Sequence, residues 1–294
     1  MRKGQKDMKS LTSLLLVLML AVVSCSGAKT RPVSFEGLEP KRFDLVLVHG
    51  LSNKHKWGED FLDACLRVWG SGNVYVVYTN DSDRIWTRTL DGRDLICAGE
   101  DDGSAGTRSI AVQTANVARA LDRLEKDHGL SRPFSIIAHS MGGLVSRSYI
   151  ADHPGRVADL VTLGTPHHGS PLADSFDWVG RFLGAREAID DLKPARVKEF
   201  NRACPVAEAR LFEGGRIYTI RGRCPNGGCF GWGGELHLGW NILRTVYDTD
   251  SDGMVPSDSA VIEGAPHLAD FPDFDHYELV QEPSVLLAAA ARLR

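Results

Sequence analysis

The sequence predicts an α/β fold in which a mostly parallel central sheet is flanked by helices. Short, near-continuous apolar runs at 43–48, 74–78, 134–138 and 157–163 are typical of parallel strands buried on both faces. Segments with an apolar helical face separate these runs, so strands and helices alternate along the chain. A length of 294 residues suits one such domain with an insertion.

The first residues are typical of an export signal. Four basic residues precede an uncharged run rich in Leu and Val, which is too short to span a bilayer. Val-Val-Ser-Cys at 22–25 resembles the bacterial lipobox, whose cysteine is lipidated and becomes the new N-terminus. We therefore predict a signal peptide over 1–24, a lipidated Cys25, and a tether over 25–40 that joins the domain to a membrane surface in the cell envelope. Cleavage near Ala28, which would yield a secreted protein, is the alternative.

The charge balance argues against nucleic acid as a partner. The chain has 34 Lys and Arg against 38 Asp and Glu, and loss of the signal peptide would remove four of the basic residues. Five cysteines follow Cys25. Cys224 and Cys229 enclose the turn-forming run Pro-Asn-Gly-Gly, and we predict a disulfide between them. A zinc site would need a second pair at suitable spacing, which the sequence lacks.

The strand at 43–48 leads into His49-Gly50, where glycine lets the backbone turn sharply. The loop after such a strand can donate a backbone N–H to an oxyanion, and we assign this role to Leu51. His49 is interpreted as a structural histidine that holds the loop. Residues 57–69 are a predicted helix, and 79–108, which are polar, are a predicted long surface loop near the functional site.

A second helix is predicted over 110–126, and the stretch 133–144 that follows predicts a nucleophile elbow. An apolar strand, small residues around Ser140 and the start of a helix follow one another directly, which exposes the serine on a strained turn. The pattern reads Ala138-x-Ser140-x-Gly142, with alanine in place of the usual first glycine. The helix would direct the backbone N–H of Met141 at a developing oxyanion.

The acid and the base of a catalytic triad follow such a serine in that order. Asp252 heads a tight turn through Gly253, and we prefer it as the acid over Asp250. The alternating aspartates around it are also compatible with a solvated loop or a Ca²⁺ site. His276 directly precedes a predicted terminal helix and is preferred as the base over His267.

Residues 171–246 do not show the alternating strand and helix patterns of the rest of the chain, apart from a strand-like run at 216–220. They are rich in Phe and Trp. We predict that this segment is a lid or cap insertion that lines an acyl pocket. For several of these rings, ordinary core packing is the alternative.

The motifs together resemble those of secreted bacterial triacylglycerol lipases of the α/β-hydrolase fold, over roughly residues 41 to 282. They are His49-Gly50, Ala138 to Gly143, Gly-Thr-Pro-His-His-Gly-Ser at 164–170, the Phe-Asn signature in Glu199-Phe200-Asn201, Ser251-Asp252-Gly253 and Asp275-His276. The resemblance implies an α/β-hydrolase domain over 41–294 that cleaves lipid-type carboxylic esters through the triad Ser140, Asp252 and His276. It implies no cofactor, although related lipases often carry a structural Ca²⁺, and no residues of this sequence are assigned as its ligands.

Two alternatives stay open at this point. A phospholipase or an acyltransferase would use the same three residues and differ in what occupies the acceptor site. A noncatalytic lipid-binding lipoprotein would keep the scaffold alone, and the intact set of Ser140, Asp252 and His276 argues against it.

Overall fold

The computed structural model describes residues 33–53, 57–175, 184–224 and 234–294. Eight strands form one sheet: β1 (Leu45–Val48), β2 (Val74–Val77), β3 (Ile85–Leu90), β4 (Arg93–Ala98), β5 (Phe134–His139), β6 (Val157–Leu163), β7 (Ile217–Gly222) and β8 (His267–Phe271). Their order is β3-β4-β2-β1-β5-β6-β7-β8. All neighbours are parallel except β3 and β4. The predicted mostly parallel sheet is confirmed.

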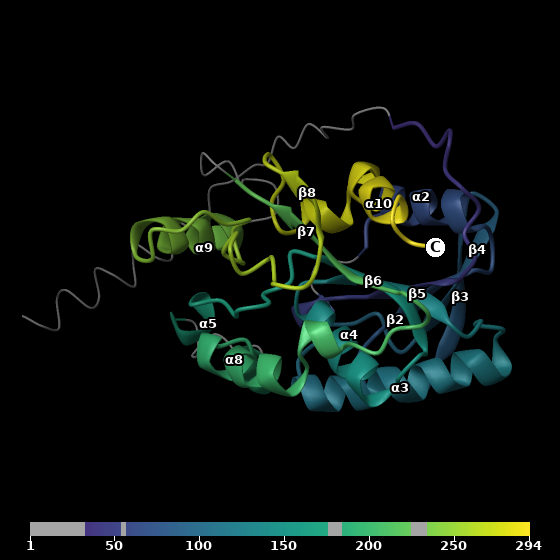
Figure 1. The fold of residues 1–294 in the computed structure, drawn as a ribbon, viewed down its shortest axis with the longest axis horizontal. Coiled ribbons are helices and arrows are strands. Elements are labelled where there is room, and N and C mark those ends of the chain that lie inside the picture. Colours follow the sequence, from purple (N-terminus) through teal and green to yellow (C-terminus); the bar gives the residue numbers. More distant parts are fainter. Residues whose placement is uncertain (1–32, 54–56, 176–183, 225–233) are drawn as a thin grey trace, which may run out of the picture.

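Helices lie on both faces of this sheet (Figure 1). They are α2 (Glu59–Trp69), α3 (Ile110–Asp127), α4 (Met141–Asp152), α5 (Leu172–Ser175), α7 (Arg186–Asp191), α8 (Pro194–Ala203), α9 (Gly234–Thr245) and α10 (Pro283–Ala290), with the short 3-10 turns η1 (Leu51–Asn53), η2 (Val206–Glu208) and η3 (Glu278–Val280). Helices α2 and α10 cover one face, and α3 and α4 cover the other.

Two hydrophobic cores fill the space between the sheet and these helices. Successive residues of a strand point to opposite faces, so Leu47 enters the core beneath α2 and α10, whereas Val46 enters the core beside α3 and α4. Both side chains are completely buried. This burial on two faces is why the strands read as continuous apolar runs.

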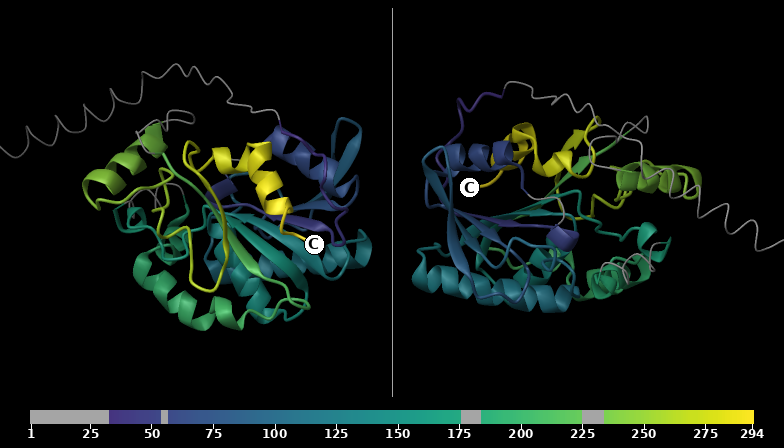
Figure 2. Two further views of the ribbon diagram at one scale, coloured as in Figure 1. Left: turned by 45° about the horizontal axis from the view of Figure 1, so that its top comes forward. Right: turned by 180° about the vertical axis from the view of Figure 1, so that it is seen from behind.

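The strand order reverses at β1, which pairs with β2 on one side and with β5 on the other. Val48, the last residue of β1, lies opposite both Val77 and Ala138. The carboxyl ends of the three strands therefore meet at one edge of the sheet, and ligand sites in such sheets lie at this switch point. The two rotated views in Figure 2 show α5, α8 and α9 together at one end of the sheet.

The prediction of a long loop over 79–108 is wrong, because β3 and β4 form a β-hairpin there and extend the sheet beyond β2. Asp91-Gly92 makes its turn with positive φ at both residues, 46° and 74°. Asp-Gly is among the dipeptides best suited to such a turn. Polar side chains on the exposed face of the hairpin interrupt the apolar pattern by which strands are recognised in a sequence. On the other face, Leu95 and Cys97 of β4 are buried.

The predicted insertion over 171–246 contains a strand of the central sheet, because β7 lies between β6 and β8. Five of its eight Phe and Trp residues, Phe176, Trp178, Phe182, Phe230 and Trp232, lie outside the described residues. The other three pack within the domain: Phe200 against the guanidinium of Arg147, Phe212 against Phe43, and Trp240 against a small buried cluster. For these three rings, the structure agrees with core packing.

The predictions for the N-terminus lie outside the described residues, which begin at 33 and exclude Cys25. None of the helices in the described ranges has the length and apolar character needed to cross a membrane. Cys224 is disulfide-bonded, and its predicted partner, Cys229, also lies outside the described residues. Cys65, Cys97 and Cys204 are free thiols.

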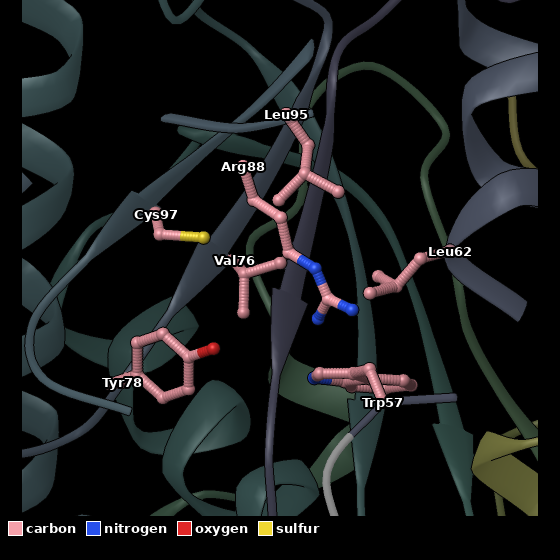
Figure 3. A pocket seen from close by; sticks show the side chains of 7 residues that line it. All are labelled: Trp57, Leu62, Val76, Tyr78, Arg88, Leu95 and Cys97. Atoms are coloured by element: carbon pink, nitrogen blue, oxygen red, sulfur yellow. The ribbon is translucent and has the colours of Figure 1, made fainter. Parts of the chain in front are cut away.

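A cavity of about 10 Å³ lies between α2 and the β2–β4 part of the sheet. Figure 3 shows the guanidinium group of Arg88 above the ring of Trp57, with the Tyr78 hydroxyl and the Cys97 thiol nearby. Trp57 Nε1 has no hydrogen-bond partner among the described residues. Burial raises the pKa of the Cys97 thiol to about 12, so this side chain is no nucleophile at neutral pH. The space suits about one water molecule rather than a substrate.

Candidate active site

Ser140 lies on a strained turn between β5 and α4. Its φ and ψ are 52° and −129°, a conformation that costs a non-glycine residue about 1–3 kcal/mol. Small neighbours permit the turn: a Cβ at Gly142 would lie 2.4 Å from the carbonyl oxygen of His49, and a Cβ at Gly50 would lie 2.7 Å from Ser140 Cβ. Ala138 belongs to β5 and has no positive φ, which explains why alanine replaces the usual glycine.

Asp252 and His276 form a buried pair. His276 Nδ1 lies 2.7 Å from Asp252 Oδ2, and the two side chains are 5% and 1% exposed. Asp252 Oδ1 accepts hydrogen bonds from the N–H groups of Met254 and Val255 at 3.0 Å and 2.8 Å. These bonds fix the carboxylate, which holds the imidazole with its proton on Nδ1 and leaves Nε2 to accept a proton.

His139 links this pair to the elbow. Its ring centroid lies 4.5 Å from that of His276, and its Nε2 lies 2.9 Å from the His276 carbonyl oxygen. Because a carbonyl only accepts, Nε2 of His139 carries the proton. Ser140 follows directly, although no hydrogen bond joins its hydroxyl to His276 among the described residues. Catalytic hydrogen bonds are often long in unliganded structures and tighten when substrate binds.

The two less favoured candidates lie in other surroundings. Asp250 pairs with Arg244 at 3.2 Å, and its side chain is 47% exposed. His267 lies on β8, where its Nε2 is 2.9 Å from Asp270 Oδ1. The structure therefore brings Asp252, rather than Asp250, together with His276.

The two residues predicted to donate backbone N–H groups to the oxyanion each lie at the start of a helical segment. Leu51 is the first residue of η1 and Met141 is the first residue of α4, and a first-turn N–H has no partner within its own helix. The close approach of Gly142 to His49 brings these two starts together. The positive end of the α4 dipole adds to the attraction for an anion beside Ser140.

His49 holds the Leu51 loop in place. Its Nδ1 lies 2.7 Å from the carbonyl oxygen of Gly50, and the N–H of Thr79 donates to its Nε2 at 3.0 Å. Burial lowers the pKa of His49 to about 4, so the ring is neutral and carries its proton on Nδ1. These contacts agree with the interpretation of His49 as a structural histidine.

Sequence reasoning missed the residues that support this loop. Thr79 Oγ1 donates to Gln113 Oε1 at 2.8 Å and accepts from the N–H of Gly106 at 2.9 Å. Gly106 lies so close that a Cβ there would be 2.4 Å from the carbonyl oxygen of Gly50. The sequence feature that could have identified them is Gln113, a glutamine among the core-facing residues of the helix predicted over 110–126.

Asp275 is a buried carboxyl group next to His276. Its Oδ1 accepts hydrogen bonds from the N–H groups of Tyr277 and Glu278, both at 2.9 Å. Burial, and then the charge of Glu278, raise its pKa from 3.8 to about 6. At pH values between 3.8 and about 6, Asp275 is protonated in the folded state and has lost its proton in the unfolded chain. The contribution of Asp275 to stability therefore falls as the pH rises from about 4 to about 6.

We expect Asp275→Asn to remove this pH dependence, because asparagine keeps an acceptor oxygen for both N–H groups and has no charge to bury. Its free energy of unfolding at pH 7 should exceed that of wild type by about 1–3 kcal/mol, and this difference should shrink towards zero as the pH falls to about 4. Urea unfolding across this range measures the effect. Asp273→Asn, at an exposed position of the same turn, is the control. A difference that does not change with pH would contradict the raised pKa.

No group of three or more His, Cys, Asp or Glu side chains within the described ranges is arranged to hold a metal ion. The aspartates near Asp252 pair with arginine instead, because Asp248 and Asp250 both lie within 4.0 Å of Arg244.

The sequence of this chain is similar to hydrolases of known fold. A family model described as the alpha/beta hydrolase fold matches residues 45–198, which include the elbow. A triacylglycerol lipase from Burkholderia plantarii is 52% identical over 162 residues, which are 53% of this chain and 40% of that lipase. A triacylglycerol lipase from Pseudarthrobacter phenanthrenivorans is 52% identical over 133 residues, 45% of this chain and 36% of that lipase. This chain thus matches about two fifths of the length of these relatives.

Solved structures share the fold over most of the chain. The mature lipase BlEst2 of Bacillus licheniformis superposes with a TM-score of 0.60 at 23% identity and covers 88% of this chain and 94% of its own. The metagenomic carboxyl esterase MGS0156 has a TM-score of 0.56 at 23% identity and covers 94% of this chain and 82% of its own. The predicted α/β-hydrolase fold, with a mostly parallel sheet flanked by helices, is confirmed.

Proposed function

The chain belongs to the α/β-hydrolase fold family, and from this premise we propose that it is a serine hydrolase that cleaves carboxylic esters of lipid type. One observation carries the proposal: the buried contact of 2.7 Å between His276 Nδ1 and Asp252 Oδ2 lies beside the strained turn of Ser140. Lipid-type esters are supported as the substrate class by the similarity to the two bacterial triacylglycerol lipases.

In the first half of the proposed reaction, neutral His276 takes the proton of the Ser140 hydroxyl through Nε2 while Oγ attacks the ester carbonyl carbon. Asp252 keeps the imidazole in the required tautomer and stabilises the imidazolium that forms. The N–H groups of Leu51 and Met141 donate to the oxyanion. The tetrahedral intermediate expels the alcohol, which takes the proton from His276, and the acyl group stays on Ser140.

Water completes the cycle by the same route. His276 takes a proton from water as the oxygen attacks the acyl carbon, and Ser140 leaves with that proton while the carboxylic acid departs. Every proton moves through His276, so one base serves both halves of the reaction.

The experiment that tests this function compares initial rates on acyl esters from acetyl to palmitoyl, on triacylglycerol and on phospholipid, with Ser140→Ala as the control. Hydrolysis of uncharged acyl esters that is lost in the variant supports the proposal. Faster cleavage of phospholipid, or transfer of the acyl group to an added alcohol, would favour a phospholipase or an acyltransferase. Absence of turnover on every ester would overturn the proposal and leave a lipid-binding scaffold.

We further propose that the protein is exported and anchored in the cell envelope by a lipid on Cys25, on the support of the lipobox-like sequence at 22–25. Cys25→Ala should move the protein from the membrane fraction to the soluble fraction, because each buried methylene of the lipid contributes about 0.8 kcal/mol. Cell fractionation measures this change, with Ser26→Ala as the matched control. Mass spectrometry that finds an unmodified N-terminus downstream of residue 25 would contradict the anchor.

A further inference from the structure

A buried arginine without a carboxylate partner lies on α4, two turns after Ser140. Arg147 is 2% exposed. Its Nη1 donates to Asn201 Oδ1 at 2.9 Å and to His167 Nδ1 at 3.2 Å, and its Nη2 donates to the carbonyl oxygen of Cys204 at 2.6 Å. All three acceptors are neutral, since burial holds the pKa of His167 well below its ordinary value. Within the described part of the chain no carboxylate forms an ion pair with Arg147.

The guanidinium group of Arg147 has donors left over. A guanidinium carries five N–H groups, and the three hydrogen bonds above use three of them. The Nε–H has no partner among the described residues, and Nη2 has a second N–H. Nε–H and an N–H of Nη2 form one edge of the guanidinium plane, which can hold a carboxylate through two parallel hydrogen bonds.

The positive charge of Arg147 also favours the binding of an anion. Burial lowers its pKa to about 10, so the group is still cationic at neutral pH. A buried cation is costly unless an opposite charge or a full set of hydrogen bonds compensates it. The neutral neighbours of Arg147 supply only part of that compensation.

Arg147 lines a cavity of about 330 Å³. The cavity lies between the end of α4, the end of α8, η2 and the start of β7, and its volume falls in the range of about 300–1,000 Å³ that is usual for small-molecule sites. Six of the ten residues that line it are apolar, namely Ile150, Ala151, Ala203, Pro205, Ala209 and Ile217. Glu208 and Arg210 are the exposed charged residues that line it.

We propose that this cavity, the Arg147 pocket, binds a small amphiphilic carboxylate: the carboxylate pairs with the free edge of Arg147, and a short hydrocarbon body covers the apolar wall. The exposed carboxylate of Glu208 disfavours a dianion such as phosphate. The pocket is separate from the candidate active site, because Ser140, Asp252 and His276 do not line it. The inference therefore does not depend on ester hydrolysis.

Calorimetric titration of the full-length protein with hexanoate tests the proposal. Arg147→Lys keeps the charge but loses the planar edge, and it should weaken binding by about tenfold or more. Ala209→Leu fills part of the cavity with a larger side chain and leaves the hydrogen-bond partners of Arg147 unchanged, so it should weaken binding similarly. This second variant keeps the test valid if Arg147→Lys fails to fold.

Four controls localise the binding. Arg210→Lys, at the exposed arginine of the same pocket, and Ser140→Ala should both leave hexanoate affinity unchanged. Glu208→Gln should tighten binding by about two- to fivefold, because it removes a like charge near the carboxylate. Hexan-1-ol, which has no charge, should bind at least about tenfold more weakly than hexanoate.

Several results would overturn the proposal. One is the absence of any hexanoate binding at millimolar concentration, which would mean that water alone fills the cavity. Equal affinities for wild type and both pocket variants would place the ligand elsewhere, and loss of binding only in Ser140→Ala would place it in the candidate active site. Tighter binding of inorganic phosphate than of hexanoate would make the pocket a phosphate site.

Discussion

Ser140→Ala should reduce the turnover of an acyl ester by about a thousandfold or more while the protein stays folded. The change removes one hydroxyl oxygen, which is the proposed nucleophile, and leaves the Cβ that Gly50 accommodates. Alanine tolerates the φ of 52° no worse than serine does, so the elbow should keep its shape. Ester turnover and the thermal midpoint, measured on the same preparation, separate a chemical effect from a folding defect.

The control for this experiment is a second serine on the same helix. Ser146 is buried on α4, and its hydroxyl donates to the carbonyl oxygen of Gly142 at 2.8 Å. Ser146→Ala should change turnover by no more than a few-fold, because this bond lies within the helix and does not touch a substrate. If Ser140→Ala keeps a rate within tenfold of wild type, Ser140 is not the nucleophile.

Much of the fold could be predicted because its signals are local. At the elbow, about a dozen consecutive residues contain an apolar run, then small residues, then the start of a helix with an apolar face. Strand β5 and helix α4 form there as predicted. The hairpin at β3 and β4 was missed because its exposed face carries polar side chains. Neither strand therefore forms a continuous apolar run in the sequence.

The candidate site could be proposed from the sequence because its members follow a known chain order. Ser140, Asp252 and His276 could each be named from short motifs, and the structure brings Asp252 to His276. The residues that support them could not be named, because their roles arise from contacts between distant segments. His139 gains its role only from its contact with His276, 137 residues away.

Arg147 illustrates the same limit outside the site. In the sequence it is one basic residue on a helix, and nothing local distinguishes it from an exposed arginine. Its unusual state appears only when α8 and the loop at His167 bury it against neutral acceptors. Burial without an opposite charge is a property of the packed chain, so a pocket of this kind cannot be predicted from spacing.

Asp252→Asn should lower ester turnover by about ten-thousandfold, although asparagine has the same shape. Its Oδ1 can still accept from the N–H groups of Met254 and Val255, so the turn should survive. The side-chain amide would then present an N–H, in place of an oxygen, to His276 Nδ1. That nitrogen must become the acceptor, the ring proton moves to Nε2, and the imidazole can no longer take the proton of Ser140.

Asp250→Asn is the matched control, because it makes the same chemical change two residues away on a side chain that pairs with Arg244 and is 47% exposed. An exposed pair of this kind contributes about 0–1 kcal/mol to stability and does not touch His276, so turnover should fall by no more than a few-fold. Measurement of kcat/KM against pH separates the two variants further. Asp252→Asn should recover activity at high pH, where hydroxide can replace the missing base, whereas Asp250→Asn should follow the wild-type profile. Equal losses in both variants, or a larger loss in Asp250→Asn, would show that the acid of the triad is not Asp252.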